Sequence, residues 1–324
     1  MVTAGTTDEL VAAVRAADAA GERVLLVGGG SNLLVADDGF PGTVVLVRSR
    51  GVTVAVENDH VGLTVAAGEP WDDLVAQGVA AGWSGLEALS GIPGSTGATP
   101  IQNVGAYGAE VAAFVTAIEV LDRRSGQVRT LGPEQAGFGY RTSALKRSPG
   151  AFVVLAVTMR LARDPRSAPV GYAELARVLG VEVGTRVPSV HVRAAVLELR
   201  RGKGMVLDPT DHDTWSAGSF FTNPVLAPEQ ADSLPPEAPR FPTPDGQVKT
   251  SAAWLITHAG FERGFAVRPD ASAALSRKHA LALTNRGEAT ADDLLELAHA
   301  VRAGVAERFG IVLENEPTLV GCAL

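Results

Sequence analysis

The stretch Gly91–Gly108 constrains the fold of this chain more than any other, because it is a long loop packed with glycine and small polar residues. Glycine lets the backbone approach a ligand closely, since no side chain stands in the way. Pro93, Pro100, Ile101 and Val104 are interleaved with the glycines and favour a fixed path over a floppy loop. The stretch therefore predicts a rigid loop that brings its backbone against a flat or phosphorylated ligand.

The first glycine motif along the chain, Gly28–Asn32, follows the predicted buried strand Val24–Val27, and the Gly91–Gly108 loop is the second. It does not fit the dinucleotide fingerprint of a Rossmann fold, because Leu33 stands where the third glycine would fall. The acidic residue that the fingerprint needs about 20 positions later is also missing, since Arg48 and Arg50 occupy that neighbourhood. Successive backbone N–H groups could still hold a pyrophosphate, and a tight structural turn is the alternative. Two separated glycine loops in one domain suit a dinucleotide ligand.

A third motif, Ser216–Pro224, places the hydroxyl of Ser219 between a glycine and two aromatic residues. No Gly-x-Ser-x-Gly pattern surrounds this serine, which disfavours a hydrolase triad. Arg141 follows an aromatic residue, and Glu316 follows a predicted final strand. Taken singly, each of these three side chains also suits a turn or a solvated surface. Their occurrence together with the glycine loops makes them candidates for a site.

The composition describes a globular chain: of its 324 residues, 46% are hydrophobic and 20% are charged, enough for two or three domains with a buried core. The net charge of −8 argues against a protein that binds nucleic acid by neutralising phosphates. Cys322 is the single cysteine and no HExxH pair occurs, so we expect neither an intrachain disulfide nor a metal. We also expect no membrane span and no signal peptide, and hence a cytoplasmic protein. The absence of heptad repeats suits a monomer.

Hydrophobic periodicity predicts a mixture of helices and strands, with a boundary at Arg163–Arg166. Before it, the pattern indicates a helix capped by Thr6 or Thr7, a helix at Trp71–Ala81, and strands at Val24–Val27, Thr43–Val47, Val52–Val56, Val61–Ala66, Val115–Leu121, Gln127–Leu131 and Ala151–Leu161. After it, the pattern indicates helices at Ser189–Arg201, Ser251–Ala259 and Thr290–Phe309, an irregular proline-rich excursion at Leu234–Pro244, and a final strand at Ile311–Leu313.

Six motifs in this order resemble the UDP-N-acetylenolpyruvoylglucosamine reductase family, and the resemblance covers nearly the whole chain. The members of this family are flavoenzymes that complete UDP-N-acetylmuramic acid in bacterial peptidoglycan synthesis. The motifs are Gly28–Leu34, Gly91–Gly108, Tyr140–Ser143, Ala217–Pro224, Ala252–Ile256 and Leu313–Pro317.

The resemblance implies an α+β fold, in which an FAD-binding domain of the vanillyl-alcohol-oxidase or PCMH type is joined to a smaller α+β substrate-binding domain. The FAD-binding domain would span residues 1–163, with subdomains at about 1–66 and 67–163, and residues 164–204 would form a connecting segment with a substrate loop. The substrate-binding domain would span 205–310, and residues 311–324 would return toward the active site as the final strand. No histidine stands in either glycine motif, so we expect non-covalent FAD, with NADPH as hydride donor.

The resemblance also assigns site residues. Those expected to contact FAD are Gly28, Gly29, Gly30, Ser31, Asn32, Gly91, Pro93, Gly94, Ser95, Gly97, Gln102, Asn103, Gly105, Ala106 and Tyr107. Those expected to bind substrate are Tyr172, Lys203, Asn223 and His279. The stretch Gly171–Leu175 is similar to the tyrosine-loop form of the family, while the insert His212–Trp215 receives no role. The catalytic residues would be Arg141, Ser219 and Glu316.

The implied reaction reduces the vinyl ether of UDP-N-acetylglucosamine enolpyruvate, adding hydride at C3 and a proton at C2. Arg141 would stabilise enolate-like charge on the substrate carboxylate, a contribution of about 3–4 kcal/mol for a preorganised group, and its forked guanidinium matches a carboxylate. Ser219 would give the proton, and Glu316 would either assist the enol while protonated or polarise the site. Two other functions stay open: an FAD oxidase of the same superfold that reduces O₂, and a non-enzymatic nucleotide-binding module.

Overall fold

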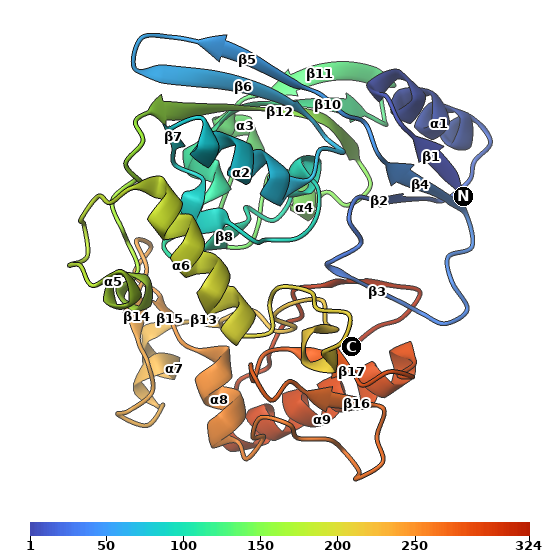
Figure 1. Cartoon of the computed structure of the whole chain (residues 1–324). Helices are drawn as coiled ribbons and strands as arrows, with labels where there is room; N and C mark the ends of the chain where they lie inside the picture. The colour runs from blue at the N-terminus through green and yellow to red at the C-terminus, as the bar shows by residue number, and fades with distance from the viewer. The chain divides into compact units, whose positions relative to one another are not determined.

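The computed structural model describes all 324 residues, and the chain divides into two compact units. Unit 1 comprises Met1–Gly30 and Pro41–Arg201, and unit 2 comprises Ser31–Phe40 and Gly202–Leu324. The short segment Ser31–Phe40 therefore groups with the C-terminal part of the chain, although it follows the Gly28–Gly30 turn directly. Figure 1 gives the labels of the helices and strands.

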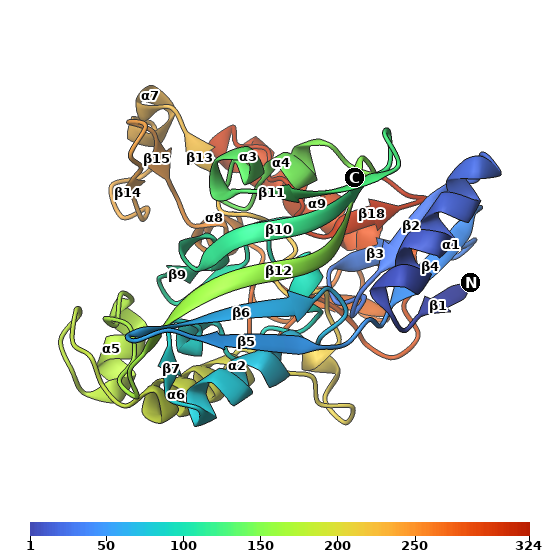
Figure 2. The ribbon, with the colours of Figure 1, turned by 90° about the horizontal axis from the view of Figure 1, so that it is seen from above.

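The main sheet of unit 1 has the strand order β11-β10-β12-β6-β5, and each neighbouring pair is antiparallel (Figure 2). The strands are β5 Val52–Val56, β6 His60–Ala66, β10 Val115–Asp122, β11 Gln127–Leu131 and β12 Phe152–Arg163, with β7 Trp83–Ser84 beside β12. Side chains of a strand alternate between its two faces, and in β6 Val61, Leu63 and Val65 are all buried. These three valine and leucine side chains share a core with Trp71 of helix α2 (Trp71–Ala80), so one face of the sheet is covered.

A smaller parallel sheet, in the order β1-β4-β2, leads into the first glycine motif. Its strands are β1 Val2–Ala4, β2 Val24–Val27 and β4 Thr43–Val47, and they pack with helix α1 Thr7–Ala19. Thr6 begins α1 with a capping box, in which its hydroxyl accepts a hydrogen bond from the Glu9 N–H. Gly28 follows β2 at once, so the glycine turn leaves from the carboxyl end of a parallel strand, where ligands commonly bind.

The other elements of unit 1 are short, except for helix α6. They are η1 Glu87–Leu89, η2 Thr96–Ala98, β8 Gly105–Ala106, β9 Ala109–Glu110, η3 Val111–Ala113, α3 Pro133–Ala136, α4 Ala144–Arg147, α5 Ala173–Leu179 and α6 Ser189–Gly202. Helices α5 and α6 pack around Val170, Leu175, Val192 and Val196, in a core separate from that of the main sheet.

Unit 2 is built around helices α8 and α9 with several short strand pairs. Its elements are β3 Leu33–Val35, η4 His212–Thr214, β13 Val225–Leu226, α7 Pro228–Asp232, β14 Phe241–Pro242, β15 Val248–Lys249, α8 Ala252–His258, β16 Ala273–Leu275, β17 Leu283–Asn285, α9 Ala291–Phe309 and β18 Thr318–Val320. The core includes Leu255, Leu275, Leu297, Val301 and Leu313. Strands β16 and β17 form an antiparallel hairpin, and β18 pairs in parallel with β3.

Most predicted elements are confirmed with ends shifted by a few residues, but two predictions are wrong. No strand forms at Ile311–Leu313: the buried Ile311 and Leu313 flank the exposed Val312 as in a strand, yet no neighbouring strand supplies a ladder there. The proline-rich excursion is not wholly irregular, since Phe241–Pro242 forms β14. That strand lies at the edge of its sheet, where a proline without an N–H is tolerated.

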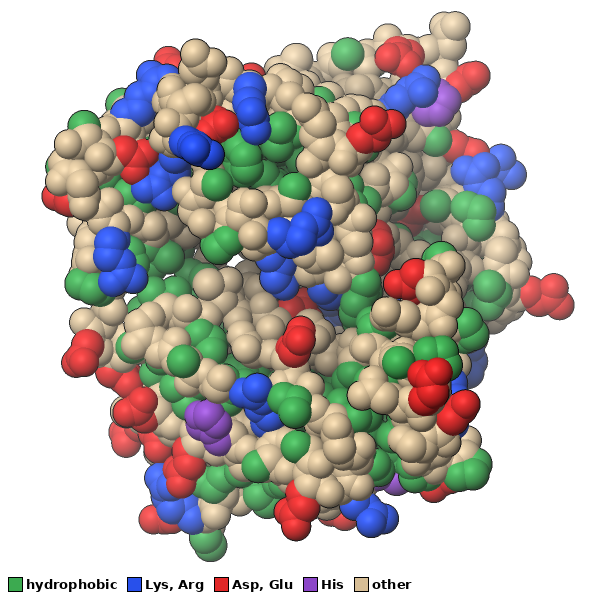
Figure 3. All heavy atoms as spheres, turned by 180° about the vertical axis from the view of Figure 1, so that it is seen from behind, with side chains coloured by type: hydrophobic (Ala, Val, Ile, Leu, Met, Phe, Trp, Pro, Cys, Tyr) green, Lys and Arg blue, Asp and Glu red, His purple; other side chains and the backbone are tan.

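The charged surface, the helices and the potential metal ligands bear on what the protein can bind. Charged side chains of both signs are interspersed on the face shown in Figure 3. None of the helices has the length and the apolar character needed to cross a membrane. No group of three or more His, Cys, Asp or Glu side chains is arranged to hold a metal ion.

Candidate active site

The two glycine motifs pack against each other within unit 1. A Cβ on Gly29 would lie 2.7 Å from the Cα of Gly94, and a Cβ on Gly28 would collide with the hydroxyl of Ser95. The backbone N–H groups of Gly29 and Gly30 donate to no other protein group, and both residues are exposed. Adjacent free N–H groups form an anion-binding concavity, so this turn fits a pyrophosphate.

Arg48 supports the same turn from behind. Its Nη1 donates to the carbonyl oxygen of Gly28 at 2.8 Å and to that of Val47 at 2.9 Å. The guanidinium therefore fixes the orientation of the Gly28 peptide and adds a positive charge beside the free N–H groups. Sequence reasoning used Arg48 only as evidence against a Rossmann fold; its position after a strand gave no signal of this contact.

The beginning of the long glycine loop is fixed by charged side chains of α2 and α6. The Gly91 N–H donates to Asp72 Oδ1 at 2.6 Å, and Arg200 Nε donates to the Gly91 carbonyl at 3.1 Å. Arg193 donates from Nη1 to Asp72 Oδ1 at 2.6 Å and from Nη2 to Asp72 Oδ2 at 2.9 Å. Burial raises the pKa of Asp72, but the bonds from Arg193 and Gly91 outweigh it and hold the pKa below its ordinary value. The loop is thus rigid at its start, and its Pro93 is exposed.

Three residues other than glycine have a left-handed backbone: Asn103, Tyr107 and Arg141, with φ of 48°, 49° and 52°. All three belong to the predicted cofactor and catalytic sets. Such a backbone costs a non-glycine residue free energy, and it persists where the surrounding structure enforces it, often at functional sites. The local strain of the chain is therefore concentrated around the second glycine loop.

Arg141 is tied to that loop through its side chain. Its Nη2 donates to the carbonyl oxygen of Gly105 at 2.7 Å, and a Cβ on Gly105 would lie 3.1 Å from its Nη1. The Arg141 carbonyl accepts a hydrogen bond from Lys146 Nζ at 3.0 Å, and the guanidinium carbon lies 5.6 Å from the centre of the Tyr140 ring. The charged fork is thereby oriented from both the backbone and the side chain.

Asn103 has a bracing role within the loop. Its Nδ2 donates to Glu110 Oε2 at 2.8 Å and to the Gly139 carbonyl at 3.1 Å, while its Oδ1 accepts from the Ala112 N–H at 3.1 Å. The residue is 1% exposed. These bonds use its side-chain donors, so what Asn103 offers a cofactor is chiefly the path that it imposes on the loop. Of the other predicted loop residues, Gly97 packs on Ala67, Ala106 lies in β8 and Gln102 is half-buried.

Tyr172 contacts Tyr107 near the end of the same loop. Its ring makes an edge contact with the ring of Tyr107, with centroids 5.8 Å apart and planes at 83°. The approach is close because both backbones carry glycine: a Cβ on Gly108 would lie 3.0 Å from the backbone of Gly171. Burial raises the pKa of Tyr107 to about 12, so this phenol stays protonated. Tyr172 itself is 45% exposed and directly precedes α5.

In unit 2 the Ser219 motif and the Glu316 motif run side by side. The Glu316 N–H donates to the Phe220 carbonyl at 2.8 Å, and the Thr222 N–H donates to the Glu314 carbonyl at 3.0 Å. Ser219 Oγ lies 3.4 Å from His279 Nε2, a long hydrogen bond. The structure of unit 2 thus brings together a predicted catalytic serine, a predicted catalytic glutamate and a predicted substrate-binding histidine.

Other predicted residues of unit 2 are Asn32, Asn223 and Lys203. Asn32 follows Ser31, and its Nδ2 donates to the Glu316 carbonyl at 3.4 Å, so part of the first glycine motif supports the Glu316 segment. Asn223 accepts from the Ala252 N–H at 2.9 Å and so helps to begin α8. Lys203 is half-buried directly after α6. Arg141 belongs to unit 1, whereas Ser219 and Glu316 belong to unit 2.

Comparison with known proteins decides the family. Residues 208–320 match the family model described as UDP-N-acetylenolpyruvoylglucosamine reductase, C-terminal domain, and residues 1–132 match the FAD binding domain model. The UDP-N-acetylenolpyruvoylglucosamine reductase of Salinispora arenicola is 56% identical over 100% of this chain and 91% of its own length. The chain belongs to this reductase family.

Other relatives agree with that assignment. The UDP-N-acetylenolpyruvoylglucosamine reductase of Cutibacterium acnes is 54% identical, over 100% of this chain and 86% of its own length. The crystal structure of UDP-N-acetylenolpyruvylglucosamine reductase from Thermus caldophilus superposes with a TM-score of 0.64 at 28% identity, covering 98% of this chain and 91% of that one. The resemblance read from the six motifs and the expected α+β fold with an FAD-binding domain are confirmed, and the chain is a flavin-dependent oxidoreductase.

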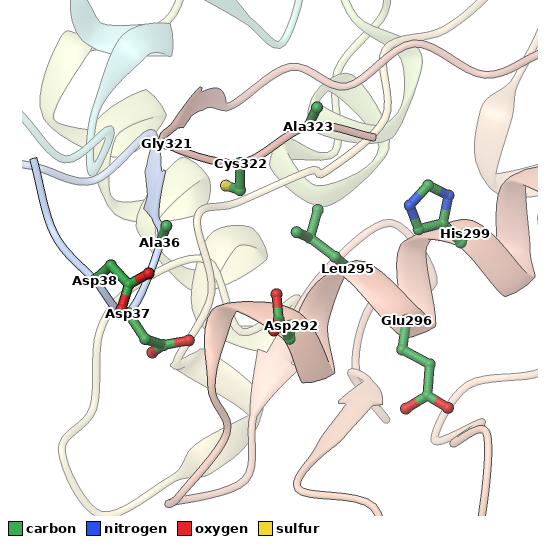
Figure 4. A pocket seen from close by; sticks show the side chains of 10 residues that line it. All are labelled: Ala36, Asp37, Asp38, Asp292, Leu295, Glu296, His299, Gly321, Cys322 and Ala323. Carbon is green, nitrogen blue, oxygen red and sulfur yellow. The ribbon is translucent and has the colours of Figure 1, made fainter.

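A separate hollow of about 600 Å³ in unit 2 holds none of the predicted site residues (Figure 4). It is lined by Ala36, Asp37, Asp38, Asp292, Leu295, Glu296, His299, Gly321, Cys322 and Ala323. Asp37 is committed to structure, because its carboxylate accepts from the Ala291 N–H at 2.9 Å at the beginning of α9. None of the residues that line the hollow belongs to the six reductase motifs.

Proposed function

We propose that this chain reduces the enolpyruvyl ether of UDP-N-acetylglucosamine enolpyruvate to UDP-N-acetylmuramate, a step of peptidoglycan precursor synthesis, with NADPH as electron source and non-covalent FAD. The observation that carries the proposal is full-length identity of 56% to a reductase named for this substrate. The second glycine loop, which contains the left-handed residues Asn103 and Tyr107 and contacts Arg141, supports the proposal because it offers side chains and backbone suited to this reaction.

Unit 1 would hold the FAD. The free N–H groups of Gly29 and Gly30, backed by Arg48, suit the pyrophosphate, and the glycine positions of the Gly91–Gly108 loop suit close approach of the flavin ring. Bound there, FAD would supply the redox chemistry, by which hydride from NADPH would reach C3 of the substrate. Neither glycine motif contains a histidine, which supports a non-covalent cofactor.

Arg141 would hold the carboxylate of the enolpyruvyl group. Hydride addition to C3 places negative charge on C2 and, by conjugation, on the carboxylate oxygens. A guanidinium already oriented by its bond to Gly105 meets that charge without reorganising, which is the condition under which such groups stabilise a transition state most. Tyr172, Lys203 and Asn223 stay candidates for binding the nucleotide sugar, by the resemblance to the family.

Ser219 would deliver the proton to C2, which completes the addition of one hydride and one proton across the double bond. Its hydroxyl is a weak acid, but an enolate-like carbon is a strong base, so correct geometry makes the transfer feasible. His279 orients the hydroxyl from 3.4 Å, and the backbone of Glu316 is paired with that of Phe220 beside it. Cytoplasmic location and a monomeric state stay predictions.

Steady-state turnover tests the proposal. The purified protein should be yellow, should release all its FAD on heat denaturation, and should oxidise NADPH only when UDP-N-acetylglucosamine enolpyruvate is added. The product should be heavier than the substrate by two hydrogens and should match UDP-N-acetylmuramate on mass spectrometry. NADPH oxidation that needs O₂ and leaves the enolpyruvyl compound unchanged would instead support the FAD oxidase, and a colourless protein that takes up no FAD would support a binding module.

A further inference from the structure

Asp213 is a buried acid in the insert His212–Trp215, to which the sequence motifs assign no function. The insert forms the turn η4, and Asp213 is 7% exposed. A carboxylate is rarely buried unless charged or polar groups compensate for its lost hydration. The groups that bind the Asp213 carboxylate therefore indicate which part of unit 2 the insert stabilises.

Those partners directly follow the two strands of the β16–β17 hairpin. Asp213 Oδ1 accepts from the Arg277 N–H at 2.9 Å and from Arg286 Nη1 at 2.8 Å. The backbone carbonyl of Asp213 accepts from Ser276 Oγ at 3.2 Å. Asp211 adds an ion pair to Lys278. The insert is thus bonded to the residues that follow β16 and to the residue that follows β17.

The turn between these two strands carries His279. Bonds from Ser276 N–H to the Ala282 carbonyl at 2.8 Å and from Ala282 N–H to the His279 carbonyl at 3.1 Å close the turn. The Phe220 N–H donates to the Leu281 carbonyl at 2.7 Å, so the turn is also attached to the residue next to Ser219. The imidazole of His279 reaches Ser219 Oγ at 3.4 Å from this platform.

We propose that Asp213 is a positioning residue, which holds the Ser276–Ala282 turn so that His279 orients the Ser219 hydroxyl for proton delivery. The proton step rests on the proposed function, whereas the placement of His279 by Asp213 does not. Asparagine at position 213 keeps an acceptor oxygen but loses the charge that faces Arg286. A small displacement of a reacting group is costly, since about 1 Å of misplacement can slow a reaction about 100-fold.

The kinetic test compares Asp213→Asn with Asp208→Asn in the FAD-loaded protein. Asp208 is the matched control: it is an exposed acid of the same segment whose carboxylate bonds only to Thr210, at 2.9 and 2.7 Å. Under anaerobic stopped flow, Asp213→Asn should slow flavin reoxidation by the enolpyruvyl substrate about tenfold and leave flavin reduction by NADPH unchanged. Asp208→Asn should match wild type in both steps. Equal reoxidation rates in the two variants would overturn the proposal.

A spectroscopic test separates this inference from the proposed function. The ¹⁵N resonances of the His279 imidazole, assigned with His279→Gln, should shift in Asp213→Asn and stay at their wild-type positions in Asp208→Asn. If wild-type reduced flavin is not reoxidised by the substrate, the proposed function fails, and these resonances still decide the placement; unshifted resonances would overturn it. Should Asp213→Asn not fold, Arg286→Lys breaks the same contact from the other side and should shift the same resonances.

Discussion

The Arg141 guanidinium donates a 2.7 Å hydrogen bond to the carbonyl oxygen of Gly105, although 36 residues separate the two along the chain. Gly105 has little room for a side chain, since a Cβ there would lie 2.8 Å from Glu110 Cγ and 3.1 Å from Arg141 Nη1. The glycine loop therefore holds the side chain of Arg141, the predicted anion-stabilising residue, in place. A substitution at Gly105 should therefore displace the Arg141 guanidinium as well.

Arg141→Lys should slow the substrate step far more than it slows flavin reduction. Lysine keeps the charge but lacks the fork that reaches both Gly105 and a carboxylate. We expect flavin reoxidation by the enolpyruvyl substrate to fall about 100-fold, the usual cost of one preorganised stabilising group, while reduction by NADPH changes little. Arg147→Lys is the matched control, because exposed Arg147 also donates to a glycine carbonyl, that of Gly137, outside the site. Comparable losses in both variants would argue against a role specific to Arg141.

Gly29→Ala should weaken FAD binding. A Cβ on Gly29 would lie 2.7 Å from the backbone Cα of Gly94, so the two glycine loops must move apart. The free N–H groups of Gly29 and Gly30 would then be displaced from the arrangement that suits a pyrophosphate. FAD affinity, measured by quenching of flavin fluorescence, should fall about tenfold or more, roughly 1.4 kcal/mol. Gly202→Ala serves as control, because a Cβ there meets nothing within 4 Å, and its FAD affinity should stay at the wild-type value.

Ser219→Ala should separate the two half-reactions. The flavin should still be reduced by NADPH at the wild-type rate, whereas its reoxidation by the enolpyruvyl substrate should slow about 100-fold or more, as expected for loss of a positioned acid. Rapid-mixing absorbance of the flavin follows both steps. The control is Ser233→Ala, an exposed serine of unit 2 whose hydroxyl donates to the Gln230 carbonyl. Wild-type rates in both half-reactions of Ser219→Ala would remove the serine from the proton step.

Asp72 should contribute stability that is lost in acid. Although burial alone would raise it, the pKa of Asp72 lies below its ordinary 3.8 because Arg193 and the Gly91 N–H bind the charged form. A folded pKa below the unfolded one stabilises the protein above pH 4 or so, and the contribution disappears as the pH falls through the folded pKa. The gap in Tm between wild type and Asp72→Asn should therefore shrink from pH 6 to pH 3.

The neighbour Asp73 provides the comparison for that pH series. Asp72 and Asp73 both lie in the first turn of α2, but Asp73 is exposed. Asp73→Asn should change Tm only slightly, with little dependence on pH. A gap for Asp72→Asn that stays constant over the whole range would contradict the account of the Arg193 contact.

Local chemistry was enough to predict most elements from the sequence. Thr6, Ser251 and Thr290 each accept a hydrogen bond from the first turn of a helix, as hydroxyl residues before an apolar stripe predict. Runs of apolar, mostly β-branched residues predicted the strands β6 and β12 in the same way. These signals act over a few residues, so they are visible in the chain without knowledge of its tertiary contacts.

Long-range contacts were not visible in the same way. The pairing of β3 with β18 joins residues near 34 to residues near 319, and a parallel pair between distant strands leaves no local turn signal. For the same reason the sequence predicts the final strand at Ile311–Leu313, whereas the structure has it at Thr318–Val320. The sequence assigns no role to the insert that contains Asp213, because its partners Arg277 and Arg286 lie 64 and 73 positions away along the chain. The left-handed backbone of Asn103 was hidden too, since its brace depends on Glu110 and Gly139.

An anaerobic half-reaction experiment tests the central claim most directly. The FAD-loaded protein is reduced with one equivalent of NADPH, and UDP-N-acetylglucosamine enolpyruvate is then added while the flavin absorbance is followed. The account predicts rapid return of the oxidised flavin spectrum with formation of an equal amount of UDP-N-acetylmuramate. A flavin that stays reduced until air is admitted would contradict the assignment of the Arg141 and Ser219 motifs to this reduction.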